Sequence, residues 1–197
     1  DPESALHHAF LVADTVTGHK LSAEEELGGG FAVEGGLSDA LFLAEKNAIY
    51  PDRAQIRHLD DYIQDFVRDD LQNPGDDTVG SAFTDSRSVA LNYGRPEMYP
   101  MTYSLYHSMY RVASTYGETR LEAREYLSLA YRTAIAMFRE GIQRSARSAG
   151  LLGNGRLFDL MEDLAAVGMT DEVGQLLKFT NARASEILRR EFPYAPE

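Results

Sequence analysis

The sequence predicts an all-α protein built from antiparallel helix pairs. Apolar residues recur at helical spacing along several stretches of the chain, and glycines and capping residues separate these stretches at short intervals. Connections this short force neighbouring helices to run antiparallel. Two architectures give such a succession of helix, tight turn and helix: an arc of an (α/α) toroid or solenoid, and a helical bundle. We expect part of a toroid or solenoid, with the helical bundle as the alternative.

The chain divides into two predicted regions. Residues 1–36 are expected to hold a short helix near residues 4–13 and a loop that contains Gly28, Gly29, Gly30, Gly35 and Gly36. Residues 37–197 are expected to form the helical-pair domain, as part of a larger toroid. Its helices are predicted near residues 37–46, 53–71, 96–117, 120–150, 154–167 and 171–190.

Capping residues fix several of these boundaries. Asp52 with Gln55, and Thr119 with Glu122, have the spacing of a capping box, in which two side chains satisfy the first free N–H groups of a helix. Gly117 suits the position after a helix, where a left-handed backbone is needed. These residues predict where three of the helices begin or end.

Charge and composition exclude several classes of function. The chain has 19 basic and 31 acidic residues, a net charge of −12, which disfavours binding to nucleic acid or to an anionic membrane surface. No apolar run approaches the roughly 20 residues that span a bilayer. Cysteine is absent, and neither a metal-ligand spacing nor a phosphate-binding loop is present. We therefore expect no nucleic-acid partner, no membrane partner, no metal and no cofactor.

The predicted helix at residues 96–117 carries two stripes of large side chains. The first stripe is Met98, Met101, Leu105, Met109 and Val112, and the second is Tyr99, Tyr103, Tyr106 and Tyr110. The tyrosines suit core packing with hydrogen-bonded phenols. They also suit a platform on which sugar rings stack. Tyr99, Tyr103 and His107 are therefore substrate-binding candidates, although a histidine on such a helix is commonly structural.

Two polar clusters at helix boundaries supply candidate catalytic groups. One runs from Glu45 through Asn47 to Tyr50, and the other contains Asp85, Tyr93, Arg95 and Glu97. Cleavage of a glycosidic bond needs two carboxyls about 5–10 Å apart. The catalytic candidates are therefore Glu45, Asp85 and Glu97, and the substrate-binding candidates include Asn47, Tyr50, Tyr93 and Arg95. For each acid, a solvated charge or a helix cap is the alternative interpretation.

Several of these segments resemble a known family. The segments are 41–51, 93–99, 106–110 and 191–197, and they resemble a large bacterial family of glycoside-hydrolase-like proteins that combine a β-sandwich with a helical (α/α) toroid. The resemblance covers roughly residues 31–197. It implies a carbohydrate substrate, a secreted or periplasmic location, and Glu45, Asn47, Tyr93, Arg95, Glu97 and Tyr99 as pocket residues. A whole toroid is longer than this chain, so we expect further groups from the remainder of a larger chain or from a second subunit.

The expected function is a glycoside-hydrolase-like enzyme that acts on a poly- or oligosaccharide. A polysaccharide lyase on the same scaffold is an alternative, with Tyr103 or His107 as the base and Arg95 neutralising a uronate. A non-catalytic helical-repeat interaction domain and a ligand-binding or regulatory bundle are further alternatives. The enzyme hypothesis predicts that Glu45 and Glu97 face the same cavity as the tyrosine stripe.

Overall fold

The computed structural model describes residues 7–11, 13–20, 36–80, 98–139 and 155–189 of the chain. The described part is helical, with two isolated bridges and no strand, so the predicted all-α class is confirmed. Its helices are α2 (Leu37–Ile49), α3 (Arg53–Tyr62), the π-helical segment η2 (Ile63–Leu71), α4 (Met98–Tyr116), α5 (Ala123–Arg139), α7 (Arg156–Ala166) and α8 (Thr170–Arg189).

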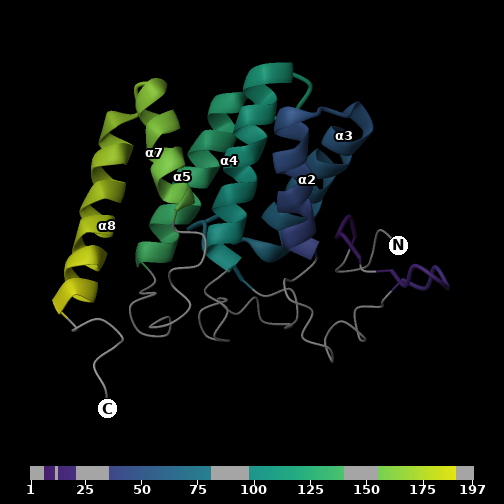
Figure 1. Ribbon diagram of the computed structural model, residues 1–197, viewed down its shortest axis with the longest axis horizontal. Coiled ribbons are helices and arrows are strands. Elements are labelled where there is room, and N and C mark those ends of the chain that lie inside the picture. The colour runs from purple at the N-terminus through teal and green to yellow at the C-terminus, as the bar shows by residue number, and fades with distance from the viewer. Residues whose placement is uncertain (1–6, 12, 21–35, 81–97, 140–154, 190–197) are drawn as a thin grey trace, which may run out of the picture.

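The helices form three antiparallel pairs, which confirms the predicted pairing. Helix α2 pairs with α3, α4 with α5, and α7 with α8, and Figure 1 shows all three short turns at the upper end of the molecule. The first helices of the pairs are neighbours, because α4 contacts both α2 and α7. Helices α2, α4 and α7 all begin at the lower end in Figure 1, where η2, α5 and α8 end.

The turn between α2 and α3 is held by side chains from both helices. Asp52 caps α3 as predicted, and its Oδ1 accepts hydrogen bonds from the backbone N–H groups of Ala54 (2.9 Å) and Gln55 (3.0 Å). The Gln55 side chain does not close a capping box; its Oε1 instead accepts from Lys46 (2.9 Å) and Asn47 (3.1 Å). Asn47 Oδ1 accepts from the Asp52 backbone N–H at 2.7 Å. Asn47, a predicted substrate-binding residue, is therefore buried in this turn.

The capping box predicted at Thr119 and Glu122 does not form. Gly117 ends α4 with a φ of 63°, as expected, but α5 begins only at Ala123. The Thr119 hydroxyl donates to the backbone carbonyl of Leu121 at 2.9 Å, and the Glu125 carboxylate accepts from the Glu122 backbone N–H at 3.0 Å. Thr119 therefore closes the turn between the helices, and Glu125 supplies the carboxylate of the cap.

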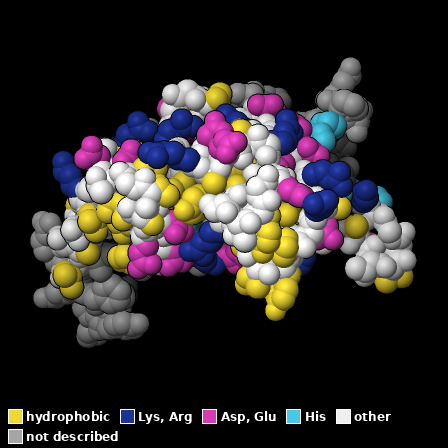
Figure 2. Space-filling view, turned by 90° about the horizontal axis from the view of Figure 1, so that it is seen from above, with side chains coloured by type: hydrophobic (Ala, Val, Ile, Leu, Met, Phe, Trp, Pro, Cys, Tyr) yellow, Lys and Arg dark blue, Asp and Glu magenta, His cyan; other side chains and the backbone are white. Residues whose placement is uncertain are grey.

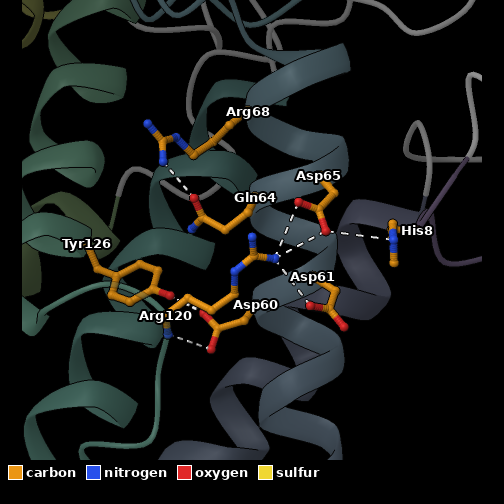
Figure 3. A network of polar contacts seen from close by, with 8 residues as sticks. All are labelled: His8, Asp60, Asp61, Gln64, Asp65, Arg68, Arg120 and Tyr126. Carbon is orange, nitrogen blue, oxygen red and sulfur yellow. Dashed lines mark hydrogen bonds and ion pairs between the residues drawn. The ribbon is translucent and has the colours of Figure 1, made fainter.

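This turn is tied to α3 by a buried carboxylate (Figure 3). Asp60 is 1% exposed, and it accepts hydrogen bonds from the Tyr126 hydroxyl and from the Arg120 backbone N–H. The Arg120 guanidinium also contacts Asp61 (3.3 Å) and Asp65 (3.2 Å), which are four residues apart and so lie on one helix face. Two parts of the chain that are far apart in the sequence are joined at this point: α3 with the start of η2, and the α4–α5 turn with the first residues of α5.

A second buried network joins the other end of η2 to the two central helices. Gln72 follows η2 directly and is 3% exposed. Its Oε1 accepts from the Tyr106 hydroxyl of α4 at 2.7 Å, and its Nε2 donates to the Thr133 hydroxyl of α5 at 2.8 Å. These bonds satisfy polar groups that would otherwise be costly to bury. They fix how the α4–α5 pair packs against the first pair.

The N-terminal region differs from the prediction. No helix is present in the described residues 7–11 and 13–20, and residues 4–6 and 12 lie outside the described part. Asp14 instead holds a turn, because its carboxylate accepts from the backbone N–H groups of Val16 (2.8 Å) and Thr17 (2.7 Å). The Phe10 ring packs edge-on against Tyr62, with ring centroids 4.9 Å apart. Tertiary packing of Phe10 and local turn chemistry therefore prevail over the weak helical pattern.

Gly36 permits this packing, and replacing it should destabilise the protein. Its φ is 73°, and a Cβ atom built there would lie 2.4 Å from both the Cβ and the backbone oxygen of Phe10. We expect Gly36→Ala to lower the free energy of unfolding by about 2 kcal/mol or more, because alanine is strained in a left-handed backbone conformation and its Cβ would clash with Phe10. Urea denaturation measures this loss. The matched control is Gly174→Ala within α8, where nothing lies within 4 Å and a gain of about 0.5–1 kcal/mol is expected. Equal effects at the two positions would contradict this account.

Candidate functional site

The tyrosine stripe of α4 lies in the core. Tyr99, Tyr103 and Tyr106 are at most 1% exposed, and the Tyr106 hydroxyl is bonded to Gln72. Burial raises the pKa of the Tyr103 and Tyr106 phenols well above their usual range. Of the four tyrosines only Tyr110 is partly exposed. The packing interpretation therefore holds for the three buried rings, and they form no open platform for a ligand.

His107, another substrate-binding candidate, links α4 to α7. The residue is 2% exposed, and its Nε2 lies 2.7 Å from Asp163 Oδ2 of α7. Arg111 Nε donates to the same oxygen at 3.4 Å. Burial lowers the pKa of His107, and the positive charge of Arg111 acts in the same direction, while the hydrogen bond to Asp163 opposes the shift. A neutral imidazole in a buried contact suits a structural role.

Glu45 lies where it can take part in chemistry. Its carboxylate forms an ion pair with Arg156, the first residue of α7, and the side chains are 36% and 38% exposed. Arg156 Nη1 also lies 3.8 Å from Asp159 Oδ2, one turn further along α7. One guanidinium thus bridges a carboxylate of α2 and a carboxylate of α7. The carboxylates of Glu45 and Asp159 therefore face the same side chain, although they belong to different helices.

These residues belong to a wider group of ionisable side chains. We use the name charged face for Glu45 of α2, Arg111 of α4, and Arg156, Asp159 and Asp163 of α7. Their side chains are between 29% and 44% exposed, and each is paired with a group of opposite charge. The charged face therefore spans the first helix of each pair, and its polar groups remain accessible from solvent.

Exposed aromatic and apolar side chains adjoin Glu45 on α2. Phe42 is 71% exposed and Ile49 is 69% exposed, and both share a helix face with Glu45 at spacings of three and four residues. Tyr50, a predicted substrate-binding residue, directly follows α2 and is 71% exposed. Figure 2, seen from the end with the short turns, shows hydrophobic side chains protruding at one side of the molecule. Aromatic rings beside convergent polar groups are typical of small-ligand sites.

The remaining candidates, Asp85, Tyr93, Arg95 and Glu97, lie outside the described residues. Glu97 directly precedes Met98, the first residue of α4. Figure 1 shows that the first helices of all three pairs begin at one end of the molecule. Arg156 of the charged face is the first residue of α7, so it lies at the end of the molecule where α4 also begins. That Glu45 and Glu97 share a cavity stays a prediction, and the three buried tyrosines are not available to line it.

Two features are absent from the described residues. Within these ranges, no group of three or more His, Asp or Glu side chains is placed to hold a metal ion. None of the described helices combines the length and the apolar character that crossing a membrane requires.

The burial of His107 predicts a pH dependence of stability. The pKa of His107 is lowered from 6.5, so below pH 6.5 the unfolded chain binds a proton that the folded protein excludes. The free energy of unfolding should therefore fall as the pH is lowered from 7.5 towards 5, by about 1.4 kcal/mol for each unit of pKa difference. Urea denaturation at several pH values measures the slope, and His107→Gln should flatten it. An unchanged slope in that variant would show that other groups cause the dependence.

Comparison with known proteins places the chain in a family. Residues 81–197, more than half of the chain, match DUF5695, which is described as a family of unknown function, so the chain belongs to that family. No curated protein and no solved structure matches the chain.

Proposed function

We propose that this member of the DUF5695 family is a carbohydrate-active enzyme of the glycoside-hydrolase type, acting on a poly- or oligosaccharide. The observation that carries the proposal is the bridge that Arg156 makes between Glu45 and Asp159. Two carboxyls brought together in this way can act as the acid and the base, or the acid and the nucleophile, of glycoside cleavage, which requires a separation of about 5–10 Å. Glu45 retains its predicted catalytic role, and Asp159 is a partner that the sequence did not suggest.

The binding platform in this proposal differs from the one expected from the sequence. The exposed rings of Phe42 and Tyr50 flank Glu45 along α2, so they can stack on the apolar faces of sugar rings. Eight helical residues correspond to about 12 Å along the axis, so the two rings suit an extended saccharide better than a single sugar. Arg111 and Arg156 supply guanidinium donors for sugar hydroxyls.

A toroid arc remains our interpretation of the architecture. The first helices α2, α4 and α7 adjoin one another, and α8 contacts α5 and α7 at the edge of the described part. The exposed side chains of Leu177 and Leu188 on α8 offer apolar surface to a further helix pair, as neighbouring repeats require. Asp85, Tyr93, Arg95 and Glu97 would contribute from the segment before α4.

The lyase alternative receives less support from the same residues. A lyase needs an accessible base that abstracts a proton from a uronate. Tyr103 and His107 are buried, and the raised pKa of the Tyr103 phenol disfavours the phenolate form. Neither residue can therefore reach a polysaccharide in this conformation.

A substrate panel tests the proposal. The protein is incubated with soluble neutral and acidic polysaccharides, and reducing ends and ultraviolet absorbance are both recorded. We expect new reducing ends on at least one polysaccharide without absorbance from unsaturated sugars. Absorbance that rises together with reducing ends would identify a lyase, and no product on any polysaccharide would argue against an enzyme of either kind.

A further inference from the structure

A pocket separate from the charged face lies between the N-terminal segment and α3. Its volume is about 390 Å³, within the range of small-molecule sites. Ala9, Phe10 and Leu11 form an apolar wall. The rest of the lining is polar and consists of His8, Lys20, His58 and Asp61.

The walls of this pocket are held in place by contacts on both sides. Phe10 is fixed by its edge-on contact with Tyr62 and by its close approach to Gly36. His8 has a φ of 63°, a sparsely populated conformation for a residue with a side chain, and such strain is common at binding sites. The backbone of His8 places its Nε2 3.7 Å from Asp65 Oδ2 (Figure 3).

The polar lining contains groups of both charges, and atoms of each remain available to a ligand. Arg120 contacts only Oδ1 of Asp61, at 3.3 Å, and no described residue donates a hydrogen bond to Oδ2. The side chains of Lys20 and His58 form no hydrogen bond or ion pair with the described residues, and both residues are exposed. A carboxylate oxygen, an ammonium and an imidazole therefore lie around one pocket that also has an apolar wall.

We propose that this pocket binds a small apolar α-amino acid in its zwitterionic form. Asp61 accepts hydrogen bonds from the ligand ammonium, Lys20 and His58 contact the ligand carboxylate, and the apolar side chain packs against Phe10 and Leu11. A cation alone would leave the Lys20 ammonium without a counter-charge in the pocket, and an anion alone would leave Asp61 Oδ2 without a hydrogen-bond donor. Desolvating such groups is costly. The zwitterion matches both, which is the basis for selecting this class.

Isothermal titration calorimetry with L-phenylalanine tests the proposal. Two probes of similar size serve as comparisons: phenethylamine lacks the carboxylate, and 3-phenylpropanoate lacks the ammonium. We expect saturable binding of L-phenylalanine with a 1:1 ratio, and binding of each comparison compound that is weaker by about tenfold or more. Equal affinity for all three compounds, or no saturable binding of L-phenylalanine, would overturn the proposal.

Variants locate the binding within the pocket. Lys20→Ala and Asp61→Asn should each weaken L-phenylalanine binding by about tenfold, because each removes one charged hydrogen bond. Lys178→Ala, on an exposed position of α8, is the matched control and should bind as the wild type does. Thermal melting of each variant shows whether it is folded. Asp61→Asn also weakens the ion pair with Arg120, so it can lower stability as well as binding. Lys20→Ala leaves that ion pair intact and therefore tests the proposal independently. Unchanged binding in a folded Lys20→Ala variant would place the ligand elsewhere.

Discussion

Replacing Glu45 by glutamine is expected to lower kcat by about 10³-fold on whichever polysaccharide the wild type cleaves. Glutamine keeps the size of the side chain and its position on α2, but it can serve neither as a nucleophile nor as a base. Asp159→Asn should cause a loss of similar order, since glycoside cleavage needs both carboxyls. Initial rates of reducing-end release over a range of substrate concentrations measure kcat and KM separately.

The matched control for this loss is Glu162→Gln. Glu162 lies on α7 between Asp159 and Asp163, is exposed, and is not part of the charged face. Its substitution should change kcat by less than about twofold, as expected of a surface position without partners. Phe42→Ala should raise KM more than it lowers kcat, because the ring contacts substrate and not the reacting atoms. Full activity in Glu45→Gln would refute the assignment of Glu45.

Replacing Asp60 by alanine is expected to lower the free energy of unfolding by about 3 kcal/mol. The substitution leaves the Tyr126 hydroxyl and the Arg120 backbone N–H without their acceptor at a buried position, and each unpaired donor costs about 1–3 kcal/mol. Burial raises the pKa of Asp60, so the charge itself is unfavourable there. Asp60→Asn removes that charge and keeps one acceptor oxygen, and it should cost less than Asp60→Ala.

Urea denaturation of both Asp60 variants measures these differences. Glu162→Ala is the control for stability, since an exposed acid of α7 without a partner among the described residues should change the free energy of unfolding by no more than about 0.5 kcal/mol. If Asp60→Ala is as stable as the wild type, the network around Asp60 does not hold the α4–α5 turn against α3.

Local signals in the sequence are sufficient to predict the helices. The side chain of Asp52 and the left-handed conformations of Gly117 and Gly168 mark boundaries through chemistry within a few residues, and these boundaries are close to those observed. The predicted start of α5 is too early, because Thr119 and Glu125 can both satisfy backbone groups near that turn. The helix expected near residues 4–13 is wrong because Phe10 packs against Tyr62, a contact that no local pattern reveals.

The candidate site could be predicted only in part. The helical period places the tyrosines of α4 on one stripe. A stripe in the core and an exposed platform have the same period, so the sequence pattern could not predict that Tyr103 is only 1% exposed. The pairing of Glu45 with Arg156 joins residues 111 positions apart. No spacing rule connects such residues, and only the packing of α2, α4 and α7 brings them together. Sequence reasoning therefore proposed Glu45 and Tyr50 as candidates but did not propose Arg156, Asp159 or Asp163.

The most direct test of the proposed function is a crystal structure of the Glu45→Gln variant with an oligosaccharide of the type that the wild type cleaves. We predict that the sugar chain lies along α2, with a ring against Phe42 or Tyr50. The glycosidic oxygen should lie within about 3 Å of the substituted amide on α2 or of the Asp159 carboxylate. A saccharide bound away from both α2 and α7, with Asp159 out of its reach, would contradict the assignment of the charged face as a catalytic site.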